Sequence, residues 1–182
     1  MDDFSSLGFE YGDSELVLGL VYAVGTDDRR INDALRDHLE KFRYKVNPIR
    51  LSNFLDRLAR SRGEKLPAEP YADYIDSRMK EGNRARRETG RDDVLALAAV
   101  SEISKDRGRD KDLPTPRPRT AHALFSVKRP EEVLTLRRIY GPGFYLIGVF
   151  ATEEERLAFL EKDKNVPHER AVELIARDQG ER

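Results

Sequence analysis

The feature that most constrains the fold is a continuous apolar run at residues 16–22, LVLGLVY. Its length is that of a strand, and a strand without polar alternation is expected to be covered on both faces, as in a parallel sheet between helices. The run leads into AVGTDD, after which Ile31, Leu35, Leu39 and Phe42 recur at helical spacing. The pattern predicts a buried strand, a tight glycine turn and a helix, in that order.

Strand-like and helical segments alternate along the rest of the chain. Further strands are expected at residues 44–49, 121–127 and 144–150. The predicted helices between and after them have starting signals near Ser52, Pro70, Asp92, Pro130, Thr152 and Pro167. This alternation predicts an α/β fold, a mostly parallel sheet flanked by helices, with ligands bound beyond the carboxyl ends of the strands.

The chain of 182 residues fits one domain, which we expect at residues 15–182, after an N-terminal arm at residues 1–14. Residues 106–119, DRGRDKDLPTPRPR, are rich in proline and charge. A connection of this length and composition predicts a mobile, lid-like loop.

Composition limits the available chemistry. The chain has no cysteine, which excludes disulfides, thiolate zinc sites and cysteine nucleophiles, and its three histidines make a histidine-rich metal site unexpected. The 33 basic residues nearly balance the 34 acidic ones, so no overall field favours nucleic acid or a membrane. The acidic N-terminus lacks a signal-peptide pattern, and the longest apolar run is too short to span a bilayer. We therefore expect a cytoplasmic protein without a membrane partner.

The first turn departs from a full phosphate loop. A strand that leads through a glycine turn into a helix presents backbone N–H groups to an anion, and the full motif reads G-x-x-x-x-G-K-[ST]. With Gly25 aligned on the internal glycine of kinase loops, Tyr22 stands at the first glycine and Asp27 at the last. Asp28 stands at the lysine and Arg29 at the hydroxyl residue. The motif has therefore lost its lysine.

Two interpretations of this turn remain open. Asp27 and Asp28 stabilise a first helical turn but repel a triphosphate. One interpretation has the backbone N–H groups of Gly25 and Thr26 bind a phosphate, with Arg29 in place of the missing lysine; whether magnesium takes part is open. The other is an ordinary strand-to-helix turn that Thr26 or Asp27 caps.

A second candidate cluster follows the third predicted strand, on the same edge of the sheet. A conventional enzyme of this architecture offers an acidic group there, but this chain offers Lys128 and Arg129. The two cations suit an anion such as a nucleotide phosphate. The alternative is a solvated pair ahead of a helix that Pro130 opens.

A third basic cluster surrounds Gly82. Most of its side chains are expected to face solvent, and one or two are candidates for clamping a phosphate or reaching RNA. The basic side chains and one amide of the cluster are Arg78, Lys80, Asn83, Arg84, Arg86, Arg87 and Arg91.

Five stretches, LVLGLVYAVGTD, YKVNPIRLS, MKEGNR, SVKRPEEVLTLRRIYG and LIARD, resemble the N-terminal part of the bacterial anti-phage dCTP deaminase family. They span nearly the whole chain, and the fourth is the most specific. The resemblance implies a three-layer P-loop NTPase or nucleotide-kinase-like domain that senses nucleotides or controls a zinc-dependent deaminase domain. A weaker similarity is to dephospho-CoA kinase and nucleoside monophosphate kinases, where the helix of the M-x-x-G-N-R segment, with Arg84, holds the acceptor nucleotide.

The chain itself cannot deaminate. A zinc deaminase needs H-x-E and P-C-x-x-C motifs, and the chain has neither, so no zinc is expected in it. Three arrangements remain: a piece of a longer chain, a deaminase on a separate chain, or a free-standing relative with its own role.

The leading hypothesis is a nucleotide-binding regulatory domain of an anti-phage dCTP deaminase defence system, without catalysis of its own. Expected partners are an NTP, dNMP or dNTP, a cytidine deaminase domain in cis or in trans, an inhibitory RNA and a second copy of the chain. The alternatives are an active nucleotide or nucleoside monophosphate kinase and a non-catalytic protein- or RNA-interaction module. The expected nucleotide contacts are Gly25, Thr26, Arg29, Arg84, Lys128 and Arg129.

Overall fold

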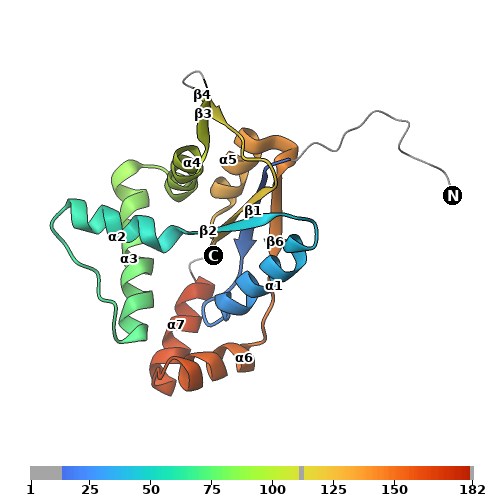
Figure 1. The fold of residues 1–182 in the computed structure, drawn as a ribbon. Coiled ribbons are helices and arrows are strands. Elements are labelled where there is room, and N and C mark those ends of the chain that lie inside the picture. The colour runs from blue at the N-terminus through green and yellow to red at the C-terminus, as the bar shows by residue number, and fades with distance from the viewer. Residues whose placement is uncertain (1–13, 111–112, 181–182) are drawn as a thin grey trace.

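A four-stranded, all-parallel sheet lies at the centre of the computed structural model, which describes residues 14–110 and 113–180 (Figure 1). The expected arm at residues 1–14 lies outside these residues except for Ser14. The strand order is β2-β5-β1-β6, with all neighbours parallel. The strands are β1 (Leu16–Val21), β2 (Lys45–Arg50), β5 (Thr120–Phe125) and β6 (Phe144–Gly148).

Helices cover both faces of the sheet, which gives the α/β architecture predicted from the sequence and is consistent with a three-layer P-loop-like fold (Figure 1). No helix of the described residues is long and apolar enough to cross a membrane. The helices are α1 (Asp28–Glu40), α2 (Leu51–Ser61), α3 (Tyr71–Thr89), α4 (Val94–Asp106), α5 (Pro130–Tyr140), α6 (Glu153–Ala158) and α7 (His168–Gly180), with short helical turns at Gly141–Gly143 and Phe159–Asp163.

The two central strands are the most apolar and the most buried. Every residue of β5 is buried, and so are the four middle residues of β1. Val17 of β1 packs with side chains of α2, α4 and α5 on one face, whereas Leu20 packs with Ile31 and Leu35 of α1 on the other. The strand β2 carries Pro48, which an edge strand tolerates because one side of it donates no ladder hydrogen bonds.

Three predicted helix starts agree with the structure. Asp27, one of the two proposed caps, accepts a hydrogen bond from the backbone N–H of Arg29 at 3.1 Å. Pro130 is the first residue of α5. Thr152 and Glu155 form the reciprocal capping box of α6.

Other helix boundaries differ from the sequence-based expectation. The helix α2 begins at Leu51, one residue before Ser52, and Leu51 is buried in the core. Pro70 precedes α3 as its N-cap residue, and Asp93 takes the N-cap position of α4 that we expected for Asp92. Phe42 lies beyond the end of α1 and is 68% exposed, so it does not continue the apolar face of that helix.

The segment expected to form a lid-like loop, residues 106–119, contains two short antiparallel strands, β3 (Gly108–Asp110) and β4 (Leu113–Thr115). Glu15, immediately before β1, accepts hydrogen bonds from the Arg107 guanidinium and, at 3.1 Å, from the backbone N–H of Arg117. The described part of this segment therefore lies at the amino ends of the strands (Figure 1). That edge is opposite to the first turn, so the described part of the segment does not cover that turn.

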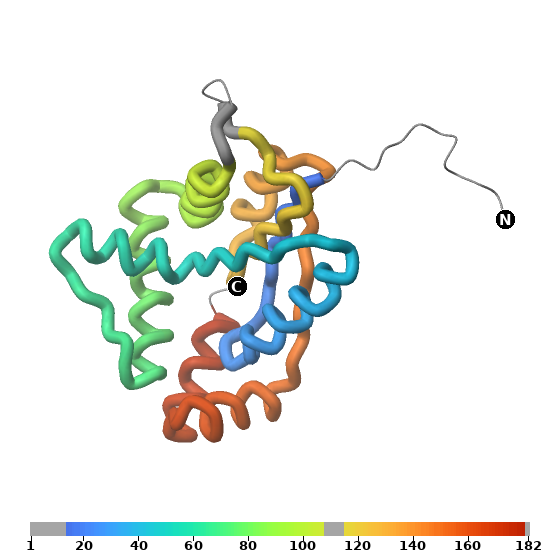
Figure 2. The backbone as a smooth tube through the Cα atoms, viewed as in Figure 1, coloured from blue at the N-terminus to red at the C-terminus, as the bar shows by residue number. Residues whose placement is uncertain are grey.

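The C-terminal helix returns to the carboxyl end of β1. Figure 2 shows α7 beside the turn that follows this strand. Asp178 of α7 accepts a hydrogen bond from the backbone N–H of Val24 at 3.0 Å, across 154 positions of sequence. The C-terminal helix therefore helps to fix the turn that follows β1.

Candidate anion-binding pocket

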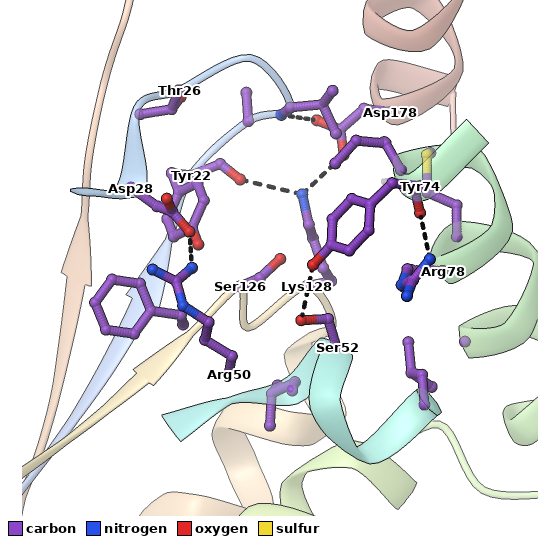
Figure 3. A pocket seen from close by; sticks show the side chains of 18 of the residues that line it. Tyr22, Thr26, Asp28, Arg50, Ser52, Tyr74, Arg78, Ser126, Lys128 and Asp178 are labelled. Carbon is purple, nitrogen blue, oxygen red and sulfur yellow. Dashed lines mark hydrogen bonds and ion pairs between the residues drawn. The ribbon is translucent and has the colours of Figure 1, made fainter. Parts of the chain in front are cut away.

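A cavity of about 410 Å³ opens at the carboxyl edge of the sheet, between that edge and helices α2 and α3 (Figure 3). The chain leaves β1 for β2 on one side and crosses from β5 to β6 on the other, so β1 and β5 flank the point where the strand order reverses. Ligands of open α/β sheets bind at this point, outside the carboxyl ends of the strands. The volume lies within the usual range for small-molecule sites.

The first turn and the end of β5 line the same cavity, as the sequence predicted. Gly25 and Thr26 reach it from the turn, and Lys128 and Arg129 reach it from the other side. A direct bond joins the two segments, because the Lys128 Nζ donates to the carbonyl oxygen of Tyr22 at 3.1 Å (Figure 3).

Gly25 is required by the packing of the turn. Its φ is +89°, and a Cβ atom there would lie 2.8 Å from the Cβ of Arg156 and 2.9 Å from its carbonyl oxygen. No side chain fits at that distance, and a positive φ itself favours glycine. The fold therefore needs this glycine whether or not a ligand binds.

The backbone N–H of Thr26, which we expected to bind a phosphate, is already used within the turn. Its N–H closes the turn by donating to the carbonyl oxygen of Ala23 at 3.2 Å. Its Oγ1 is buried and has no hydrogen-bond partner among the described residues. Thr26 therefore lines the cavity without a free backbone N–H, and its hydroxyl is a buried polar group without a partner among the described residues.

Asp27, the N-cap residue of α1, and Asp28, its first residue, each pair with an arginine. Asp27 binds Arg29 at 3.1 Å, and the Arg29 side chain is 58% exposed, which does not reproduce a phosphate-loop lysine. Asp28, at the lysine position, pairs with Arg50, whose guanidinium lies 5.0 Å from the centre of the Phe125 ring. These pairs offset the repulsion that the two carboxylates exert on an anion.

Arg84, expected to bind a phosphate, lies outside the cavity. Its guanidinium contacts Glu64 at 2.8 Å and Glu88 at 2.6 Å. Asn83 and Arg86 line the cavity instead. The residues of α3 that reach the cavity therefore lie on another face of the helix than Arg84.

The lining of the cavity is strongly basic, although the chain as a whole has a formal charge of −1. Asp28 and Asp178 are its two carboxylates. The seven basic residues are Arg29, Arg50, Arg78, Arg86, Lys128, Arg129 and Lys164. Arg29, Arg78 and Arg86 pair with carboxylates outside the lining, so the positive charge at this edge is smaller than the number of basic residues implies.

Several of these cations retain unused donors. The guanidinium of Arg129 forms no ion pair with any described residue. Lys164 also pairs with no described carboxylate, and its ammonium lies 4.8 Å from the centre of the Tyr71 ring. Arg86 pairs with buried Glu132 at 2.8 Å, but its Nε is buried without a partner. Such donors favour an anionic ligand because an unpaired buried donor is costly.

Tyr22, Tyr71 and Tyr74 also line the cavity. The sequence did not indicate this, because the spacing of Tyr71 and Tyr74 is that of an ordinary apolar helix face. Their rings stack with centroids 5.7 Å apart, and the Arg78 guanidinium lies 4.0 Å from the centre of the Tyr74 ring. Burial, reinforced by the nearby charge of Asp28, raises the pKa of Tyr71 to about 12 and also raises the pKa of Tyr22. Both phenols are therefore protonated at neutral pH and offer O–H donors.

No protein-family model matches the chain, and no curated protein matches its sequence. Within residues 14–110 and 113–180, no group of three or more histidine, aspartate or glutamate side chains lies where it could hold a metal ion.

Proposed function

We propose that this chain is a nucleotide-binding regulatory domain and that the cavity at the carboxyl ends of β1 and β5 is its nucleotide site. The observation that carries the proposal is the basic lining at the point where the strand order reverses, in which Arg129 and Lys164 have no carboxylate partner among the described residues. A phosphate accepts hydrogen bonds from several such donors at once.

The remaining lining favours a nucleotide over a simple anion. Tyr22, Tyr71 and Tyr74 supply aromatic surface, and the hydroxyls of Ser52 and Ser126 also lie in the wall. Apolar surface with a few polar groups is the usual composition of a pocket that encloses a ring system. A base and a sugar fit this description, and the basic groups then take the phosphate.

Binding without phosphoryl transfer is part of the proposal. Transfer requires a lysine on the β- and γ-phosphates and a magnesium ion between them. In this chain Asp28 stands at the lysine position, and Asp28 and Asp178 are each paired with a cation. These features support a domain that senses a nucleotide. From the resemblance, we propose that it controls a cytoplasmic anti-phage dCTP deaminase, in cis or in trans.

The test is isothermal titration with ATP, dCTP and dCMP, with and without magnesium, together with a phosphotransfer assay. We expect saturable binding of at least one nucleotide and no transfer. Turnover that disappears in Arg29→Ala would instead identify a nucleotide kinase. Flat titrations, combined with RNA binding that weakens steeply with salt, would identify an RNA-interaction module.

A further inference from the structure

The carboxylate of Asp178 lies where the sequence predicts a phosphate. One of its oxygens lies 2.8 Å from the Nζ of Lys128, and the other accepts the backbone N–H of Val24 at 3.0 Å. The side chain is only 5% exposed. Figure 3 shows Lys128 between this carboxylate and the carbonyl oxygen of Tyr22. A buried anion thus binds the first turn and the lysine beyond β5 at the same time.

The stability of α7 does not explain why a carboxylate is buried at its C-terminal end. Asp178 is in the last turn of α7, which ends at Gly180, and the helix dipole disfavours a carboxylate there. Burial of a carboxylate is also costly unless charges and hydrogen bonds compensate. Lys128 and the Val24 N–H contribute to that compensation. They are a lysine and a loop N–H, the two kinds of group by which phosphate loops hold phosphate.

We propose that Asp178 is an internal anion that competes with the phosphate of the ligand for Lys128 and the first turn, so that nucleotide binding releases the C-terminal end of α7. The inference rests on the proposed nucleotide site and names how that site is regulated. A phosphate at Lys128 brings a second negative charge next to the carboxylate, and two anions at such a distance repel each other. The phosphate has more charge and more acceptor oxygens, so it displaces the carboxylate.

The release is confined to the end of the helix. Ala171, Leu174 and Ile175 hold the earlier turns of α7 in an apolar cluster with Ala72 of α3 and Leu160. These contacts do not depend on the charge of the cavity. The binding of a nucleotide therefore changes the last turn of α7 and leaves the rest of the helix in place.

The first experiment compares the affinities of wild type, Asp178→Asn and Glu173→Gln for dCTP, dCMP and inorganic pyrophosphate by isothermal titration. Asparagine keeps the size and an acceptor oxygen but removes the competing charge, so we expect about tenfold tighter binding. Glu173 lies on the same helix, with its side chain 61% exposed and paired with Arg170. Glu173→Gln is the matched control and should bind like wild type.

The second experiment uses only the wild-type chain, so it remains decisive if circular dichroism finds Asp178→Asn unfolded. Amide hydrogen exchange is measured with and without the tightest-binding nucleotide. When nucleotide is bound, we expect about tenfold faster amide exchange at the last turn of α7 and slower exchange at the turn that follows β1. Two results would contradict the proposed competition between Asp178 and phosphate without contradicting the nucleotide site. One is equal affinity of wild type and Asp178→Asn, and the other is unchanged exchange at the last turn of α7 when nucleotide is bound. No binding by any of the three proteins would overturn both.

Discussion

Glu132 of α5 and Arg86 of α3 form a buried ion pair across the cavity wall, with 2.8 Å between Oε1 and Nη2. The other oxygen of Glu132 accepts the backbone N–H groups of Lys128 at 2.8 Å and Arg129 at 3.2 Å. One carboxylate thus fixes the backbone of the two cations that follow β5 and the side chain of a third. Glu132 therefore positions Arg86, Lys128 and Arg129, three of the basic residues that line the cavity.

Glu132→Gln should destabilise the chain by about 3 kcal/mol, because it leaves the buried Arg86 guanidinium without its anion. Urea unfolding measures the change. The exposed neighbour Glu131 gives the control, since Glu131→Gln should change stability by no more than about 0.5 kcal/mol. Equal stability of the two variants would show that the buried pair does not anchor α5 to α3.

Arg129→Ala should weaken nucleotide binding about tenfold, the typical loss for one charge-assisted hydrogen bond to a phosphate. Isothermal titration measures the affinity. Arg84→Ala is the control, because Arg84 lies outside the cavity and contacts Glu64 and Glu88. A loss of affinity in Arg84→Ala with none in Arg129→Ala would mean that the ligand binds elsewhere on α3.

Gly25→Ala should lower the unfolding free energy by about 2 kcal/mol or more, since it adds a backbone penalty and a contact of 2.8 Å with Arg156. Gly63 is a control that separates the backbone penalty from the close contact. Its φ is +79° and no atom lies within 4 Å of the position of its Cβ atom. Gly63→Ala should therefore cost only the backbone part, about 1 kcal/mol. Thermal unfolding of both variants checks the difference, and equal losses would contradict the role assigned to Arg156.

Glu15 should make the stability depend on pH at the acid end. Burial by itself raises its pKa, but hydrogen bonds from Arg107, the Arg117 N–H and His122 outweigh burial and hold the pKa below its usual value of 4.5. A lowered pKa in the folded state adds stability above the unfolded-state pKa, and this stability is lost as the pH falls through the folded-state value. The Glu15 carboxylate therefore stabilises the folded state at neutral pH, and this contribution disappears in acid.

The corresponding variant is Glu15→Gln, which should be about 2 kcal/mol less stable than wild type at pH 7. The difference should shrink as the pH is lowered from about 5 to about 3. Urea unfolding at several pH values measures it. A difference that is constant over this range would show that the Glu15 charge has no part in tying β1 to Arg107 and His122.

The fold could be predicted because its main signals are local. The uninterrupted apolar run of β1 and the fully buried β5 indicate covered parallel strands, and this topology alone places the first turn and Lys128 at one edge. The same rule argues against a lid at residues 106–119. A segment that directly precedes a strand ends at the amino edge of the sheet, and its described part lies there.

The details of the site depend on contacts that no local pattern encodes. Asp178 bonds Val24 across 154 positions, and the spacing of α7 indicates only an amphipathic helix. Arg84 and Arg86 are two positions apart on α3, about 200° around the helix axis, so only packing decides which of them faces the sheet. A basic cluster on a helix could thus be recognised, but the face that lines the cavity could not.

A crystal structure of the chain with its tightest-binding nucleotide would decide whether the cavity is the nucleotide site. We expect phosphate oxygens about 3 Å from the donors of Lys128 and Arg129, with the base against Tyr22, Tyr71 and Tyr74. Nucleotide bound at another surface, with the cavity empty and the bond from Lys128 to Asp178 intact at saturating ligand, would contradict this assignment.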